Sequence, residues 1–378
     1  MIIRLSAILL ATITCLLPLR GNALSWSTPL TISPTSGPTA SLPKLKTDGN
    51  GVWISTWQDG SGGTNRIYFS RSDNFGLSWS SPAVLSGPAA GTSNNSDEGA
   101  NIATDRSGHW VVVWNSNRRP ESTALLDFEI AMVRSADNGI TWTAPITINS
   151  NAGSDSGYVD IAAHIATDEA GVWIASWSGT ITGTANDRDI FLSRSTDNGE
   201  TWSPRARLGT NAPSDQPTLA PHLAADNNGN WVAVCDTWDT QGGTLPSGIH
   251  IFASYSSDGG TSWSSPQSIS TALGSATVLV PVVATDRLGH WVVSYTEQGA
   301  FGTDYDVIVQ TSSDNGHNWS APAALNSDAG TDARTDSYAS IVSDGLGVWY
   351  AAWSSGESTG SNLGDDGDPL FALSLIHI

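Results

Sequence analysis

The sequence predicts an all-β protein built from six similar units, and three observations support that prediction. A turn pattern, S-x-D-x-G-x-[TSN]-W, recurs at intervals of roughly sixty residues, as in repeat architectures. Six short apolar segments begin with Gly-x-Trp. Gly, Ser, Thr and Asp are abundant while Lys and strong helix formers are scarce, and this composition favours strands and turns over helices.

Each fixed letter of the repeated turn has a physical role. The Asp accepts hydrogen bonds from the backbone N–H groups that follow it, and the Gly supplies the positive φ that a tight turn needs. The Trp leaves the turn into a strand, where its ring packs into a core. The anchoring positions of the five copies are Asn74, Asp137, Asp197, Asp258 and Asp314, of which the first is a degraded copy with Asn in place of Asp.

The sequence around each repeated turn predicts four strands. A short apolar strand ending in Asp comes first, and a Gly turn leads into a second strand that is apolar at nearly every position. Such a strand is expected in a sheet covered on both faces. A third strand precedes the repeated turn and a fourth follows it, so we predict a six-bladed β-propeller of four-stranded antiparallel blades. Cys235 takes an aromatic position of the second strand, which predicts a buried apolar residue and not a reactive thiol.

The two ends of the chain predict three segments. Residues 1–23 have the charged start, apolar stretch and small-residue cleavage site of a signal peptide, so we expect a secreted, extracellular or periplasmic protein. Residues 24–372 form the propeller, and residues 373–378 break its pattern and are expected to be an artefactual tail. The segment 24–32 resembles the strand after a repeated turn, so we expect this N-terminal strand to close the propeller as the outer strand of blade six.

The charge and the cysteine count limit the partners. The formal charge is −20, and it becomes −22 without residues 1–23, which contain Arg4 and Arg20 but no acid. This argues against nucleic acid and anionic membranes as partners. No segment is suited to span a membrane, and Cys15 leaves with the signal peptide, so no intramolecular disulfide is expected. We expect a monomer whose partners are extracellular glycans or glycoproteins.

The repeated turn is the Asp-box, or BNR repeat, and the chain resembles the sialidase superfamily of six-bladed propellers. The resemblance covers essentially the whole chain after residue 23 and implies the fold more specifically than the activity. A sialidase of that family needs three arginines around the substrate carboxylate, a Tyr nucleophile paired with Glu, and an Asp acid/base. By strand order, the Asp-boxes and the Asp-x-x-Gly turns share one face, and the loops of the opposite face would hold the ligand.

The family pattern transfers incompletely to this sequence. Ser41-Leu42-Pro43 occupies the place of the family's Arg-Ile-Pro, and no Arg lies between Arg207 and Arg287. A catalytic set can still be drawn from the loops of the opposite face, and its candidates are Arg118, Arg188, Arg334, Tyr338, Glu297 and Asp59. The first hypothesis is therefore a sialidase-like glycosidase, which requires a positive pocket. The alternative is a non-catalytic glycan- or protein-binding propeller that uses its acidic loop face.

Two further sets of residues have both a functional and a structural interpretation. Asp-x-[Asp/Glu] pairs precede several third strands and could hold Ca²⁺, although each Asp more simply caps its own strand. Their members are Asp127/Glu129, Asp187/Asp189, Asp304/Asp306 and Asp366/Asp368. His164 and His222 hold equivalent first-strand positions and could share an axial channel, but they lack a third zinc ligand. The expected chemistry requires no cofactor, and Ca²⁺ stays an option.

Overall fold

The computed structural model describes residues 31–32, 40–60, 64–87, 96–117, 128–149, 159–180, 188–208, 218–239, 248–270, 278–301, 303–326, 329–331, 335–356 and 368–374. These residues form strands and turns and contain no helix, so the predicted all-β class is confirmed for them. No described segment forms a helix with the length and apolarity that crossing a membrane would require.

The strands of residues 40–208 form three antiparallel sheets of four strands each. Sheet 1 contains β1 (Ala40–Thr47), β2 (Trp53–Asp59), β3 (Arg66–Ser72) and β4 (Ala83–Val84). Sheet 2 contains β5 (Asp97–Thr104), β6 (Trp110–Ser116), β7 (Glu129–Ser135) and β8 (Ile146–Thr147). Sheet 3 contains β9 (Asp160–Thr167), β10 (Trp173–Thr180), β11 (Arg188–Ser195) and β12 (Ala206–Arg207).

Three more sheets follow, and the last has three described strands. Sheet 4 contains β13 (Thr218–Ala225), β14 (Trp231–Asp239), β15 (Gly248–Ser256) and β16 (Gln267–Ser268). Sheet 5 contains β17 (Val278–Thr285), β18 (Trp291–Gln298), β19 (Tyr305–Ser312) and β20 (Ala323–Ala324). Sheet 6 contains β21 (Asp336–Ser343), β22 (Trp349–Ser355) and β23 (Asp368–Ser374). The predicted closing strand, residues 24–32, lies almost wholly outside the described residues.

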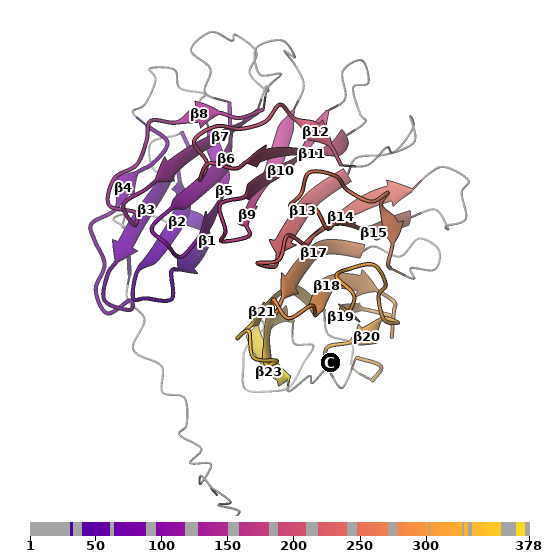
Figure 1. Ribbon diagram of the computed structural model, residues 1–378. Helices are drawn as coiled ribbons and strands as arrows, with labels where there is room; N and C mark the ends of the chain where they lie inside the picture. Colours follow the sequence, from indigo (N-terminus) through magenta and orange to yellow (C-terminus); the bar gives the residue numbers. More distant parts are fainter. Residues whose placement is uncertain are drawn as a thin grey trace, which may run out of the picture. The chain divides into compact units, whose positions relative to one another are not determined.

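The sheets follow one another in chain order, from the indigo β1 to the yellow β23 (Figure 1). The first strand of each sheet contacts the first strand of the next, from β1 to β21. The second strands hold the core between neighbouring sheets, because their Trp residues are buried; Trp110, Trp173, Trp231 and Trp291 have no exposed surface. Cys235 is buried in the same layer, as predicted.

The repeated turns are built as the sequence predicts. In the second copy, Thr141 N donates to Asp137 Oδ1 at 2.8 Å, and Gly139 N donates to Ser135 Oγ at 2.9 Å. The side-chain hydrogen bond from Thr141, followed by its backbone N–H, lowers the pKa of Asp137 to about 2. The anchoring residues of the other copies, Asn74, Asp197, Asp258 and Asp314, accept the equivalent backbone bond.

In four of the five repeated turns, the Gly also packs against the neighbouring sheet. A Cβ on Gly139, where φ is 78°, would lie 2.3 Å from Cδ1 of Ile54 in sheet 1. Three other copies pack against the second strand of the preceding sheet in the same way: Gly199 on Val111, Gly260 on Ile174 and Gly316 on Val232. The repeated turn therefore requires Gly both for its backbone conformation and for the approach of the neighbouring sheet.

Every first strand carries an irregularity two or three residues from its start. The register against the second strand shifts there in all six sheets. Five of these bulges place a residue at positive φ, and those residues are Leu42, Gly99, Ala162, Val280 and Tyr338. Bulges bend a strand and redirect its side chains, and they are common beside functional sites.

Candidate functional site

The two kinds of turn lie at the same end of the sheets. Backbone hydrogen bonds join them directly within a sheet: Phe75 N to Gly51 O, Asn138 N to Gly108 O and Gly259 N to Gly229 O, at 2.9, 2.9 and 3.0 Å. This confirms the common face predicted for the repeated turns and the Asp-x-x-Gly turns. The opposite end carries the connections between second and third strands and between consecutive sheets, so we call it the loop end.

A row of buried acidic side chains lies at the loop end. The sequence predicts Asp59 and Glu297 in loops, but the strands extend far enough to include the whole row. Its members are Asp59, Asp97, Glu129, Asp160, Asp189, Asp236, Glu297, Asp306 and Asp336, and none exposes more than a few per cent of its surface. A buried carboxylate is unfavourable unless donors surround it, so the partners of each acid distinguish a structural role from a chemical one.

Several acids of the row are held by donors from their own or the neighbouring sheet. Asp97 accepts from Trp114 Nε1 at 3.0 Å and from Ser116 Oγ at 2.7 Å. Asn149 donates to Asp160 Oδ2 at 2.6 Å and also to Glu129 Oε2, which connects sheets 2 and 3. Carboxylates that accept hydrogen bonds from such donors stabilise the ends of the strands.

Asp236 and Glu297 differ from those acids because no side chain of the described residues donates a hydrogen bond to either carboxyl group. Asp236 exposes 5% of its surface and Glu297 exposes 4%. Asp236 Oδ1 and Glu297 Oε2 have no hydrogen-bond partner in the described part of the chain, and neither residue forms an ion pair there. Burial raises the pKa of Asp236 to about 7, and burial also raises the pKa of Glu297. A carboxyl group with a pKa near 7, such as that of Asp236, can donate a proton near neutral pH.

The two groups belong to facing sides of sheets 4 and 5. Alternation along β14 puts Asp236 on the face of Val232 and Val234, and alternation along β18 puts Glu297 on the face of Tyr295. Val232, Val234 and Tyr295 belong to one buried cluster between these sheets. In the register, Asp236 is opposite Leu219 and Glu297 is opposite Val278, next to the bulges of β13 and β17.

Tyr338 lies in the bulge of β21 in sheet 6, which is equivalent to the bulges of β13 and β17 beside Asp236 and Glu297. It occupies the bulge of β21 with a φ of 56°, and 70% of its surface is exposed. A large aromatic residue in this backbone region is strained, and strained residues are concentrated at functional sites. Tyr338 is therefore available to a ligand, as the sequence-based candidate set requires.

The remaining sequence-based candidates divide into three groups. Arg188 begins β11 and pairs in register with Thr180. Asp59 ends β2 opposite Arg66 and is buried. Arg118 and Arg334 lie outside the described residues, as do Asp127, Asp187 and Asp366 of the Asp-x-[Asp/Glu] pairs. Among the residues that are described, no group of three or more His, Cys, Asp or Glu is arranged to hold a metal ion.

The first strands line a second feature, an axial cavity of about 310 Å³. His164 and His222 both line it, as expected, with ring centroids 4.0 Å apart. Burial lowers the pKa of both histidines, to about 3 for His222, and Lys46 lowers both further. The cavity also receives Arg106, Glu169 and Arg287, which the sequence-based candidate set omits. These three occupy equivalent positions of the repeat, directly after the Asp that follows a first strand.

Comparisons with known proteins agree with this architecture. The model of the BNR repeat-like domain family matches residues 52–278, as the repeated turns predict. The leech intramolecular trans-sialidase has a similar structure, with a TM-score of 0.56 and 11% identity over 93% of this chain and 70% of that one. The Penicillium chrysogenum α-L-arabinanase is also similar, with a TM-score of 0.53 and 16% identity over 89% of this chain and 93% of that one. No curated protein matched the chain by sequence.

A third similar structure is longer than this chain. The Hadza microbial sialidase Hz136 gives a TM-score of 0.52 and 17% identity over 83% of this chain, but the chain covers 63% of that sialidase. Identities this low support the fold alone, so the chemistry has to come from the side chains described above.

Proposed function

This chain belongs to the BNR repeat-like domain family, and we propose that it is a secreted glycoside hydrolase of the propeller type acting on extracellular glycans. The pair Asp236 and Glu297 carries this proposal. Hydrolysis of a glycosidic bond needs a carboxylic acid that is still protonated near neutral pH to protonate the leaving oxygen. Burial without a cationic partner raises the pKa of Asp236 to about 7 and so gives it that property, and burial also raises the pKa of Glu297.

The finer proposal is an exo-sialidase type of reaction. In that scheme Tyr338 is the nucleophile, Glu297 is its proton acceptor, and arginines such as Arg188, Arg118 and Arg334 bind the substrate carboxylate. The exposure of Tyr338 supports its part in the scheme. A neutral phenol suits an anionic sugar better than a carboxylate nucleophile does, because two negative charges repel each other.

A further part of the proposal is a six-bladed ring closed by residues 24–32. Sheet 6 has three described strands where sheets 1 to 5 have four, and residues 24–32 resemble a fourth strand in sequence. The first strands of all six sheets line a common cavity, which supports a ring. Proline substitutions at Thr28 and Leu30 should lower the melting temperature if the segment pairs with β23. An unchanged melting temperature would count against closure.

The test is hydrolysis of a fluorogenic sialoside and of an arabino-oligosaccharide, with Glu297→Gln, Asp236→Asn and Tyr338→Phe variants. Loss of general acid/base catalysis should lower kcat by about 10²–10⁴-fold for Glu297→Gln on any true substrate. Tyr338→Phe should abolish sialoside turnover if the tyrosine is the nucleophile, whereas arabinoside turnover would survive it. Asp73→Asn is the control, because Asp73 is exposed and lies in a repeated turn at the other end.

The alternative is a non-catalytic glycan- or protein-binding propeller. The exposed Ser41 of β1 favours it, since the family places an arginine there. No turnover of either substrate would reject the hydrolase. Binding to immobilised glycans, weakened by Tyr338→Ala, would then support the alternative.

A further inference from the structure

The axial cavity has a charge opposite to that of the protein. The chain as a whole carries −20, yet the ionised residues lining the cavity are Lys46, Arg106, Arg287 and a single carboxylate, Glu169. The two histidines beside them are neutral, because burial and the nearby lysines lower their pKa values. A local excess of positive charge inside a negative protein concentrates the field within the cavity.

The charged residues occupy backbone positions that suit Gly. The turn residue after each first-strand Asp has positive φ in five sheets, and it is Gly49 in sheet 1 and Gly345 in sheet 6. In sheets 2, 3 and 5 the same position holds Arg106, Glu169 and Arg287, with φ of 59°, 57° and 64°. A non-Gly residue there costs roughly 1–2 kcal/mol. The turn forms without these side chains, as Gly49 and Gly345 show. We therefore infer that the three charged residues serve the contacts that their side chains make.

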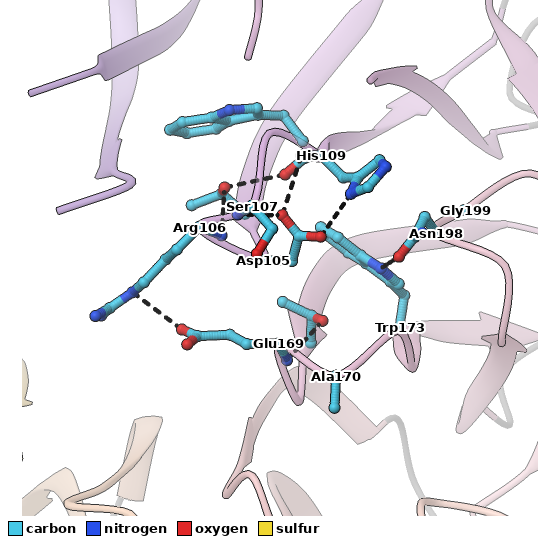
Figure 2. Close-up of polar contacts among 12 residues, drawn as sticks. Asp105, Arg106, Ser107, His109, Glu169, Ala170, Trp173, Asn198 and Gly199 are labelled. Atoms are coloured by element: carbon cyan, nitrogen blue, oxygen red, sulfur yellow. Dashed lines mark hydrogen bonds and ion pairs between the residues drawn. The ribbon is translucent and has the colours of Figure 1, made fainter. Parts of the chain in front are cut away.

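The three side chains converge on one point at the mouth of the cavity. Arg106 Nε lies 3.1 Å from Glu169 Oε1, and Figure 2 shows the two residues reaching toward each other from adjacent turns. Arg287 Nη1 donates to Glu169 Oε2 at 2.6 Å, and its Nη2 contacts the other carboxylate oxygen. One carboxylate thus faces two guanidinium groups, and one positive charge is left uncompensated.

Several cationic donors have no partner in the described part of the chain. Arg106 uses only Nε toward Glu169, so its two terminal amino groups are unpaired, and 52% of its side chain is exposed. Lys46 lines the cavity, is exposed, and forms no ion pair or hydrogen bond with any described residue. Like charges with unused donors that line one cavity form a binding site for an anion.

We propose that this end of the axial cavity binds a small oxyanion with a phosphate-like group. The site would use the terminal amino groups of Arg106 and the ammonium of Lys46 as donors, and Arg287 would be held in place by Glu169. A volume of about 310 Å³ accommodates a phosphate and excludes a long polymer. The site lies at the turn end and is separate from the carboxyl pair at the loop end.

The experiment is a titration of the full-length chain with inorganic phosphate at constant ionic strength, followed by calorimetry and by thermal unfolding. Binding to the folded state should raise the melting temperature along a saturating curve. Lys46→Gln and Arg106→Gln should each weaken phosphate binding about tenfold, as expected for the loss of one charge-assisted hydrogen bond. Lys46→Gln is the decisive variant, because Lys46 has no described partner whose loss could disturb the fold.

Two controls make the outcome unambiguous. Arg134→Gln removes one positive charge far from the cavity, where Arg134 pairs with the exposed Glu200, and should bind phosphate like the wild type. Binding of inorganic phosphate alone assigns the site to a free oxyanion, whereas binding of glucose 6-phosphate as well extends it to phosphate esters. No binding heat, or a linear stabilisation equal in all variants as excluded salts produce, overturns the proposal.

Discussion

Glu169 and Arg287 form a bidentate ion pair although 118 residues separate them in the sequence. Each comes directly after the Asp that follows a first strand, Glu169 after β9 of sheet 3 and Arg287 after β17 of sheet 5. The pair therefore fixes two turns to each other across the mouth of the axial cavity. Because Arg106 adds a third sheet to the contact, the cluster connects elements that share no hydrogen-bonded strand.

Replacing Glu169 should destabilise the protein in a manner that depends on salt. Glu169→Gln removes the one carboxylate of the cavity lining and leaves Arg106, Arg287 and Lys46 to repel one another. Breaking a buried pair costs about 3–5 kcal/mol, and partial exposure should reduce this to about 2. Urea unfolding at low and at high ionic strength measures the effect, which salt should diminish.

The control for this change is Glu200→Gln. Glu200 forms a surface pair with Arg134 at 3.4 Å and is mostly exposed, so its loss should alter stability by less than about 1 kcal/mol. Equal effects of the two substitutions would show that the Glu169 cluster is an ordinary surface contact.

Two Gly→Ala substitutions separate the two reasons for glycine in these turns, which are the positive φ and the close approach of a neighbouring sheet. Gly139 and Gly49 both have a φ of 78°, but a Cβ on Gly139 would collide with the buried Ile54, whereas one on Gly49 meets nothing within 4 Å. Gly49→Ala should cost about 1 kcal/mol for the backbone alone. Gly139→Ala adds overpacking and should cost about 2–4 kcal/mol. Chemical denaturation of both variants tests this, and equal losses would contradict the proposed packing of turn on sheet.

The order of the strands could be predicted from sequence, whereas their ends could not. Trp110 and Trp114 lie four residues apart on a largely apolar strand, and four of the six units have Trp at both positions. Asp97 was expected in a loop because acids are rare in strands. It begins β5 instead, since Trp114 and Ser116 donate to its carboxylate. Whether a buried carboxylate finds such hydrogen-bond donors depends on residues that are close in space, and a local sequence pattern does not predict them.

Only part of the candidate site could be predicted, again because the sequence shows local patterns but not which residues become neighbours in space. Glu297 and Tyr338 were selected from the sequence as residues of the loop end. Asp236 is absent from the candidates chosen by sequence, because its raised pKa follows from burial, which is a property of the packed sheets. Arg106, Glu169 and Arg287 share one column of the repeat and could have been noticed there. Their convergence depends on turns from three sheets meeting at one point.

Cys235 should be unreactive in the folded protein. Its side chain is buried against sheet 3, and burial, followed by the charges of Asp236 and Asp189, raises the pKa of its thiol. Because the thiolate is the reacting species, a disulfide reagent should label the thiol only when the chain unfolds. Labelling rates with and without urea measure this. Rapid labelling of the native chain would show that the interface between sheets 3 and 4 opens.

Replacing Asp236 should raise stability above neutral pH while lowering activity. The folded-state pKa of about 7 exceeds the ordinary value of 3.8, so the folded state holds a proton that the unfolded state has released between these limits. The free energy of unfolding therefore falls as the pH rises from about 4 to 7. The penalty, which is the stability lost by ionising this buried carboxyl, stays constant above that range. Asp236→Asn removes the penalty, which is about 1.4 kcal/mol for each unit of pKa shift.

Urea unfolding at pH 5 and pH 8 measures the effect of Asp236→Asn directly. The wild type should lose stability between the two pH values by more than the variant does, and the variant should be the more stable at pH 8. A functional carboxyl buried without a partner is expected to reduce stability, so the gain should accompany a loss of glycoside hydrolysis. Glu129→Gln is the comparison, because Glu129 is bonded to Asn149 and its replacement should destabilise the protein at both pH values. Equal behaviour of the two variants would remove Asp236 from the candidate site.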